Sequence, residues 1–370
     1  MPQPLSGLLV LDFSTLLPGP LATLMLAEAG AEVVKIERPG GETMRAIPPA
    51  WDGGGAAFAM LNRGKTGLML DLKHEADRQR LSPLLARADI LVEQFRPGVM
   101  AEFGLDFEAV RKLNPRIVYC SISGYGQSGP RAGEAGHDIN YIGATGLLAL
   151  QPGPPSHPTP PPALIADIGG GSFPALINIL LALRQRDLTG EGCHLDIAMT
   201  DAMFTFAWYA LAIGAATGRY PGAGELPLAG GSPRYALYPT KDGRLAACGA
   251  LEQKFWEAFC AAIGLAEPLR NDLADPSATR AGVAEIIAGR TAEEWRPVFA
   301  KSDCCATIVA SLEEALRDPH FVARGLFAHQ VAGASGKTIP ALALPLAPQF
   351  REPPDAKPAP ALSDAASPRA

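Results

Sequence analysis

Apolar residues in the first third of the chain follow two alternating periods. Short continuous apolar runs are typical of buried parallel strands, and longer amphipathic segments are typical of helices. The runs predict strands at residues 8–13, 31–37, 67–72, 89–94 and 117–122. The segments between them predict helices at residues 20–30, 75–87 and 107–113. Strands that alternate with helices indicate right-handed crossovers and an α/β fold with a Rossmann-like, doubly wound parallel sheet.

The rest of the chain follows other patterns. A proline-rich run at residues 152–162 predicts a stiff, extended connector. The elements expected after it are a helix at residues 172–186, a second helix at 196–216 and a hairpin at 235–248. Glycines at residues 214–231 indicate a crossing between domains, and the Pro-, Ala- and Ser-rich end predicts a disordered tail.

Composition and charge narrow the class of protein. The chain has 370 residues, and its 48% hydrophobic content is enough for a large core. Its 39 Gly and 35 Pro stay below the share that marks a disordered chain. The 32 Lys and Arg against 38 Asp and Glu give a net charge of −6, which argues against a nucleic-acid or anionic-membrane surface. An anionic ligand would therefore need a local cluster of Arg and Lys.

Several features predict a cytoplasmic protein without a membrane span. The first residues lack a signal pattern, and the apolar runs are shorter than the ~20 residues that a span needs. The six cysteines are scattered, without the spacing of a metal site, and we expect free thiols. Pro18-Gly19-Pro20 stands after the first strand where a dinucleotide fingerprint would be, which excludes a nicotinamide dehydrogenase.

One of the six histidines has a setting that suggests chemistry. His137 follows Gly136 and precedes a segment with a helical pattern, which Asp138 can cap. A capped loop explains this setting slightly better than catalysis does, as far as the residues alone decide. The other histidines lack a partner pattern and fit surface or packing roles: His74, His157, His194, His320 and His329.

Two acidic residues are further candidates. Asp167 precedes three glycines and a helix that starts at Ser172. Bare backbone amides there would form an anion nest, and a carboxylate beside them could act on a substrate oxygen that becomes negative. A plain turn after a strand explains Asp167 equally well. Glu252 ends a strand and opens a helix, where a negative charge is stabilising in itself.

Seven segments, taken in order, carry a resemblance to a known family. They are residues 30–39, 62–65, 70–73, 94–98, 123–130, 136–141 and 249–252. From about Leu5 to Phe350 the chain resembles the class III CoA-transferase family, most closely its alpha-methylacyl-CoA racemase branch. The resemblance implies an interlocked homodimer with a large Rossmann-like domain and a smaller α+β domain. The implied domains are a large CoA-binding domain at residues 1–205, a linker and small domain at 206–324, a return to the large domain at 325–350 and a disordered tail at 351–370.

The resemblance also implies an activity and its residues. Racemases of this family invert the alpha carbon of 2-methyl-branched acyl-CoA thioesters, with CoA as part of the substrate and without a further cofactor or metal. His137 and Asp167 match the pair that handles protons on opposite faces of that carbon. Glu252 matches the glutamate that contacts the histidine, and with Asp138 it would orient and tune His137. Backbone N–H groups near Asp167 and Gly169 would stabilise the enolate.

The family also contains a second reaction. In its CoA transferases, which move CoA between carboxylic acids, the aspartate that matches Asp167 is a covalent nucleophile. His137 would then be incidental. A CoA-binding role without catalysis is a more distant alternative, because it leaves both residues unexplained.

Three cations are expected to bind CoA. Arg38, Lys73 and Arg96 follow predicted strands at their carboxyl ends, where doubly wound sheets bind ligands. The resemblance places the CoA nucleotide at that edge. It adds further binding residues, which are Asp71, Gln94, Phe95, Gly136, Ile139, Asn140 and Tyr141. Arg63 and Lys65 are weaker candidates.

Overall fold

The chain forms two compact units, which the computed structural model describes over residues 3–153 and 159–364. The first unit consists of Met1–Thr145, Pro161–Thr205 and Pro319–Ala370. The second consists of Gly146–Pro160 and Phe206–Asp318. Part of the expected proline-rich connector, including His157, lies outside the described residues.

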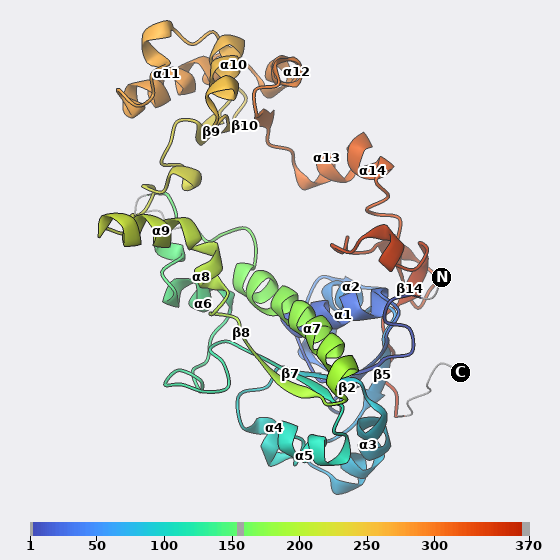
Figure 1. Ribbon diagram of the computed structural model, residues 1–370. Helices are drawn as coiled ribbons and strands as arrows, with labels where there is room; N and C mark the ends of the chain where they lie inside the picture. The colour runs from blue at the N-terminus through green and yellow to red at the C-terminus, as the bar shows by residue number, and fades with distance from the viewer. Residues whose placement is uncertain (1–2, 154–158, 365–370) are drawn as a thin grey trace. The chain divides into compact units, whose positions relative to one another are not determined.

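A six-stranded parallel sheet forms the centre of the first unit (Figure 1). The strands, in chain order, are β1 (Leu9–Asp12), β2 (Glu32–Glu37), β5 (Thr66–Met69), β6 (Ile90–Glu93), β7 (Val118–Ser123) and β8 (Cys193–Ala198). Their spatial order is β5-β2-β1-β6-β7-β8, and every neighbouring pair is parallel. The predicted parallel sheet is confirmed. Because the chain runs outward from β1 in one direction and from β6 in the other, the order reverses between these two strands, which is where such sheets bind ligands.

Helices cover both faces of this sheet (Figure 1). On one face, α3 (Glu75–Arg87) and α5 (Phe107–Leu113) bury Leu81, Leu85 and Val110 against the strands. Both helices begin and end at the predicted residues. The other face is covered by α1 (Pro18–Glu28), α2 (Ala56–Asn62) and α7 (Phe173–Thr189). Two short helices, α4 (Val99–Glu102) and α6 (Asp138–Ala144), follow β6 and β7.

The glycines after Asp167 do not form the expected nest. Ala166–Ser172 is a π-helix, η3, that continues into α7. A side chain on Gly170 would meet the backbone of Met199, and one on Gly171 would meet Pro18. The glycines therefore permit close packing, which outweighs their low helix propensity.

The joined helix Ala166–Thr189 has 24 residues and is longer than the continuous apolar runs from which no membrane span was expected. By length and composition it could cross a membrane. This is weak evidence, because the core helix of a globular protein passes the same test, and α7 packs against β7, β8 and α1.

The prediction of one helix over residues 196–216 is also wrong. Its first residues belong to strand β8, and the helical part divides into α8 (Met203–Phe206) and α9 (Trp208–Thr217). Exposed and covered side chains alternate along most of β8, so a period of two decides its conformation. The Asp196 carboxylate accepts the backbone N–H of Gln127 at 3.0 Å.

The expected disordered tail is ordered as far as residue 364. Strand β14 (Ala356–Pro358) pairs in parallel with β12 (Gln330–Ala332), which pairs with β13 (Thr338–Pro340). Arg351 lies 2.9 Å from the buried carboxylate of Glu28 in α1. Backbone pairing and this ion pair hold a segment that its composition marked as disordered. Residues 365–370 of the expected tail lie outside the described part of the chain.

The second unit combines a small antiparallel sheet with helices. Its strands are β9 (Tyr235–Pro239), β10 (Leu245–Gly249) and β11 (Ala306–Ile308), and its main helices are α10 (Gln253–Ile263), α11 (Pro276–Ala288) and α12 (Ala292–Ser302). The predicted hairpin is confirmed by β9 and β10. Trp256 and Trp295 are fully buried in the core, and each indole N–H donates to a backbone carbonyl. The short helix α13 (Leu312–Leu316) ends the second unit, and α14 (Pro319–Ala323) begins the last segment of the first unit.

Candidate active site

A pocket of about 480 Å³ opens at the carboxyl ends of β1, β6 and β7. It lies in the first unit, where the strand order reverses. Its walls come from the segments after these strands and from the start of α6 and η3. The lining residues that the sequence predicted are Gln94, Phe95, Arg96, Gly136, His137, Asn140, Tyr141 and Asp167.

His137 and Asp167 reach this pocket from different elements. His137 is the N-cap residue of α6, and its backbone N–H donates to the Asn140 side-chain oxygen at 3.0 Å. Asp167 lies in the first turn of η3 and is partly buried. Burial, together with the negative charge of Asp138 and against the opposing effect of the nearby His137, raises the pKa of Asp167 to about 6. The carboxyl can therefore both accept and donate a proton close to neutral pH.

Asp138 does not cap its own helix. Its Oδ1 accepts the backbone N–H groups of Ala166 at 2.7 Å and Asp167 at 3.0 Å. The buried Asp138 thus caps η3 from a neighbouring helix and fixes the segment that carries Asp167. The backbone N–H of Asp167 is already engaged in this way, so it is not the free donor expected for an enolate.

Tyr141 and its neighbours shape the wall beside His137. The Tyr141 hydroxyl donates to the carbonyl of Gly136 at 2.5 Å, and its ring occupies the space that a side chain on Gly124 would need. Ile139, also expected at the site, is 48% exposed and is not among the lining residues.

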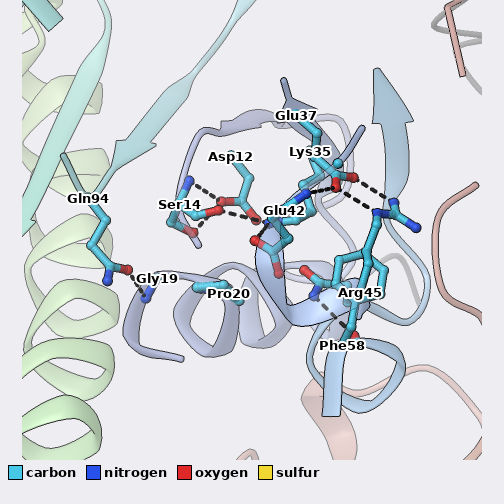
Figure 2. A network of polar contacts seen from close by, with 12 residues as sticks. Asp12, Ser14, Gly19, Pro20, Lys35, Glu37, Glu42, Arg45, Phe58 and Gln94 are labelled. Atoms are coloured by element: carbon cyan, nitrogen blue, oxygen red, sulfur yellow. Dashed lines mark hydrogen bonds and ion pairs between the residues drawn. The ribbon is translucent and has the colours of Figure 1, made fainter. Parts of the chain in front are cut away.

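The segment after β6, residues 94–97, forms the opposite wall. All four of its residues line the pocket. Gln94 Oε1 accepts the backbone N–H of Gly19 at 3.0 Å, which ties this segment to the start of α1 (Figure 2). The exposed Arg96 offers a cation at the pocket, as expected for a residue that binds phosphate.

The other expected CoA contacts lie at the same edge of the sheet but outside the pocket lining. Arg38 follows β2, is exposed and donates through Nε to the Gly41 carbonyl at 3.2 Å. Lys73 is exposed after β5, and its backbone N–H donates to Asp71 Oδ1 at 3.0 Å. Because β2 and β5 are neighbours, Arg38 and Lys73 follow adjacent strands. Their role in binding CoA stays a prediction.

The weaker candidates Arg63 and Lys65 are not available to a ligand. Arg63 is 1% exposed and pairs with Glu28 at 2.7 Å. Lys65 is buried, and its Nζ lies 2.9 Å from Asp12 Oδ2. Both positive charges are used inside the unit, so the interpretation of these two residues as CoA contacts is wrong.

Glu252 lies in the second unit. It is the exposed N-cap residue of α10, which follows β10. This agrees with its expected place between a strand and a helix. Its predicted contact with His137 stays a prediction.

Sequence reasoning missed three polar residues on adjacent strands: Glu93, Ser121 and His194. His194 was assigned a surface or packing role, but its Nε2 lies 2.9 Å from the Ser121 hydroxyl. The one available signal was a glutamate at the end of an apolar strand pattern. Nothing in the sequence pairs residues that lie 73 positions apart.

In the parts of the chain that the structure describes, no cluster of side chains indicates a disulfide or a metal site. All six cysteines are free thiols. Across residues 3–153 and 159–364, no three His, Cys, Asp or Glu side chains are arranged to hold a metal ion.

The parallel sheet and a pocket at its strand-order reversal define a ligand-binding α/β protein. Comparison with known proteins specifies the class. The model for "CoA-transferase family III" matches residues 5–365, and the chain belongs to that family.

Its curated relatives carry out both reactions of the family. The chain is 35% identical to alpha-methylacyl-CoA racemase of Homo sapiens, over 87% of this chain and 82% of the relative. It is 32% identical to acetyl-CoA:oxalate CoA-transferase of Acetobacter aceti, over 87% of this chain and 85% of the relative. The protein is thus similar to racemases and to transferases at comparable identity.

Solved structures agree with the fold. A CAIB/BAIF family protein from Brucella suis is 29% identical and has a TM-score of 0.79, covering 94% of this chain and 93% of that one. Rv3272 from Mycobacterium tuberculosis is 26% identical, has a TM-score of 0.82 and covers 98% of both chains.

Proposed function

We propose that the protein is a racemase that inverts the alpha carbon of 2-methyl-branched acyl-CoA thioesters. The observation that carries the proposal is that His137 and Asp167 line the same pocket, with the pKa of Asp167 raised to about 6. Inversion requires that one group removes the alpha proton and that another returns a proton to the opposite face. A base works best when its pKa lies near the operating pH, and Asp167 meets this requirement.

The proposed reaction divides the work between the two residues. One of them takes the alpha proton, the thioester becomes an enolate, and the other delivers a proton from the far side. Asp138 holds Asp167 through two backbone hydrogen bonds, so we assign Asp138 a positioning role toward Asp167. Arg96 binds a phosphate of CoA, with Arg38 and Lys73 further along the same edge. Glu252 orients His137 in an interlocked homodimer.

Exchange of the alpha proton tests the assignment. The substrate is a single enantiomer of a 2-methylacyl-CoA in deuterated water, followed by proton NMR. The wild type is expected to introduce deuterium at the alpha carbon, and His137→Ala is expected to lose about 10²–10⁴-fold in rate, the usual contribution of a general acid–base group. His74→Ala is a matched control, because His74 is exposed and is not among the pocket-lining residues. Unimpaired exchange in His137→Ala would contradict the assignment.

CoA transfer between carboxylic acids is the second candidate. It is favoured by the transferase relative from Acetobacter aceti, whose identity to this chain is close to that of the racemase. Asp167 would then attack the thioester carbonyl and form an acyl anhydride while CoA leaves as the thiolate. Trapping with hydroxylamine or borohydride, followed by mass spectrometry of the peptide that contains Asp167, would detect this intermediate.

A further inference from the structure

Beneath the 94–97 segment, three polar side chains from three adjacent strands form a continuous line. Glu93 ends β6, Ser121 lies in β7 and His194 lies in β8. His194 Nε2 and Ser121 Oγ are 2.9 Å apart, and the Ser121 hydroxyl is hydrogen-bonded to Glu93. Glu93 Oε2 in turn accepts the backbone N–H of Phe95 at 2.8 Å. These hydrogen bonds therefore connect His194 to the backbone of the 94–97 segment, which lines the pocket.

The directions of these hydrogen bonds follow from the number of protons. Ser121 has one hydroxyl proton, and an ionised Glu93 can only accept, so Ser121 donates to Glu93. Ser121 then accepts from His194, which must carry its proton on Nε2. A neutral histidine can supply that proton, and burial lowers the pKa of His194. The ring of His194 stacks on Phe107 with centroids 5.4 Å apart, which fixes its orientation.

We propose that Glu93 is a positioning residue whose negative charge holds the 94–97 segment, and with it Arg96, in the arrangement that binds CoA. The proposal rests on the function proposed above. Glu93 is 4% exposed, and within the described residues no cation forms an ion pair with it. Its charge is stabilised by the hydrogen bonds from Phe95 and Ser121.

The surroundings of Glu93 explain why this charge can change. A cavity of about 70 Å³ beside the main pocket is lined by Glu93 and by Arg96, which lines both spaces. The titratable and charged groups that face Glu93 or line this cavity are Tyr119, Cys120 and Ser121 from β7, His194 and Asp196 from β8, Arg96 from the wall, and Asp106 at the N-cap of α5. Burial and, to a smaller extent, the charge of Asp196 raise the pKa of Glu93 to about 7, against the hydrogen bonds from Ser121 and Phe95. The carboxylate is therefore neutralised as the pH falls through neutrality.

A neutral Glu93 carboxyl holds the 94–97 segment less firmly than the carboxylate does. A carboxylate accepts a stronger hydrogen bond from a backbone N–H than a neutral group does. The difference is about fivefold in an equilibrium constant, which corresponds to about 1 kcal/mol. We therefore expect the affinity for CoA to fall about fivefold between pH 8 and pH 6.

Calorimetric titration with coenzyme A itself, between pH 5.5 and 8.5, tests the proposal. Glu93→Gln keeps the size of the side chain and one acceptor oxygen but carries no charge. It is expected to bind CoA with the weaker affinity throughout, without the step seen in the wild type. Because the terminal phosphate of CoA itself titrates near pH 6, the measured quantity is the difference between the two proteins at each pH.

Two further variants separate Glu93 from other causes. Asp167→Asn removes the carboxyl with a raised pKa that lines the main pocket, and the step is expected to persist. Ser121→Ala removes a hydrogen bond that stabilises the Glu93 carboxylate, so the midpoint of the step is expected to move to higher pH. If Glu93 only filled space, Ser121→Ala would not shift this midpoint. The Ser121→Ala variant also keeps the test valid if Glu93→Gln does not fold.

The outcomes distinguish this inference from the proposed function. A wild type that binds CoA with the same pH dependence as Glu93→Gln would overturn the role of Glu93 and leave the proposed function standing. A folded wild type that binds no CoA at any of these pH values would overturn both.

Discussion

Two neighbouring segments flank the candidate active site, and each is held from below by a different kind of polar cluster. After β1, Asp12 Oδ1 accepts the backbone N–H of Ser14 at 3.0 Å, and Lys35 donates to the Ser14 carbonyl at 2.8 Å (Figure 2). The opposite oxygen of Asp12 lies 2.9 Å from Lys65. After β6, the 94–97 segment is held by Glu93, with which no cation of the described part of the chain forms an ion pair.

The presence or absence of a cation decides how each carboxylate responds to pH. Burial alone would raise the pKa of Asp12, but Lys65 and Lys35 hold it well below its usual range. Burial of Glu93 is opposed only by hydrogen bonds, and its pKa rises to about 7. The segment after β1 therefore has a support that stays charged at every physiological pH, whereas the segment after β6 has one that titrates.

The largest expected effect is the loss of stability when the polar cluster of Asp12, Lys35 and Lys65 after β1 is disrupted. Lys65→Met removes the ion-pair partner of the fully buried Asp12 and should lower the free energy of unfolding by about 3–5 kcal/mol, since the buried carboxylate loses the cation that contacts it. Urea denaturation measures this loss. Arg317→Ala is a matched control, because it breaks an exposed ion pair with Glu313 and should cost at most about 0.5 kcal/mol. Equal effects of the two changes would contradict the contrast between the clusters.

The next effect is the pH dependence of stability. The pKa of Glu93 is raised from 4.5 to about 7 in the folded protein, so its contribution is fully present below pH 4.5 and is lost as the pH rises through 7. The loss is about 3 kcal/mol for the wild type and absent in Glu93→Gln. Urea denaturation of both proteins at pH 5 and pH 8 should show the variant gaining relative stability at pH 8. A constant difference would show that Glu93 does not titrate in this range.

The contribution of Asp12 to stability should depend on pH in the opposite direction, and it should do so in the acid range. Its folded pKa is lowered, so its stabilising contribution is present above the unfolded value of 3.8 and is lost as the pH falls below it. The stability of wild type and Glu93→Gln should therefore fall in parallel below about pH 4. Separate acid transitions for the two proteins would contradict this assignment.

A smaller effect is expected at the link between the two segments. Gln94→Ala removes the hydrogen bond that Gly19 donates to Gln94, which is worth about 1 kcal/mol. We expect the KM for acyl-CoA to rise about fivefold with little change in kcat, because the change loosens the pocket wall and leaves His137 and Asp167 in place. Steady-state kinetics measures both values, and a fall in kcat alone would place Gln94 in the chemistry instead.

Elements that depend on neighbouring residues could be predicted from the sequence. Local patterns were sufficient for α3 and α5, whose ends match the predicted residues, and for the first five parallel strands, but not for β8. They were also sufficient to place Arg96 beside the pocket, because it follows a strand at its carboxyl end.

Features that depend on tertiary packing were not predictable in this way. The glycines after Asp167 continue a helix because Met199 and Pro18 leave no room for side chains there. Asp138 caps a helix that begins 28 positions later, and Lys65 finds its partner 53 positions away. No local period records these pairings.

The most direct test of the proposed function is optical. A single enantiomer of a 2-methylacyl-CoA is incubated with the protein in the absence of any acceptor carboxylic acid, and optical rotation is followed with time. A racemase that uses His137 and Asp167 brings the rotation to the constant value of a 1:1 mixture of the two C2 epimers without consuming the thioester. Constant rotation, together with a hydroxamate on Asp167 after treatment with hydroxylamine, would contradict the proposal and identify a CoA transferase.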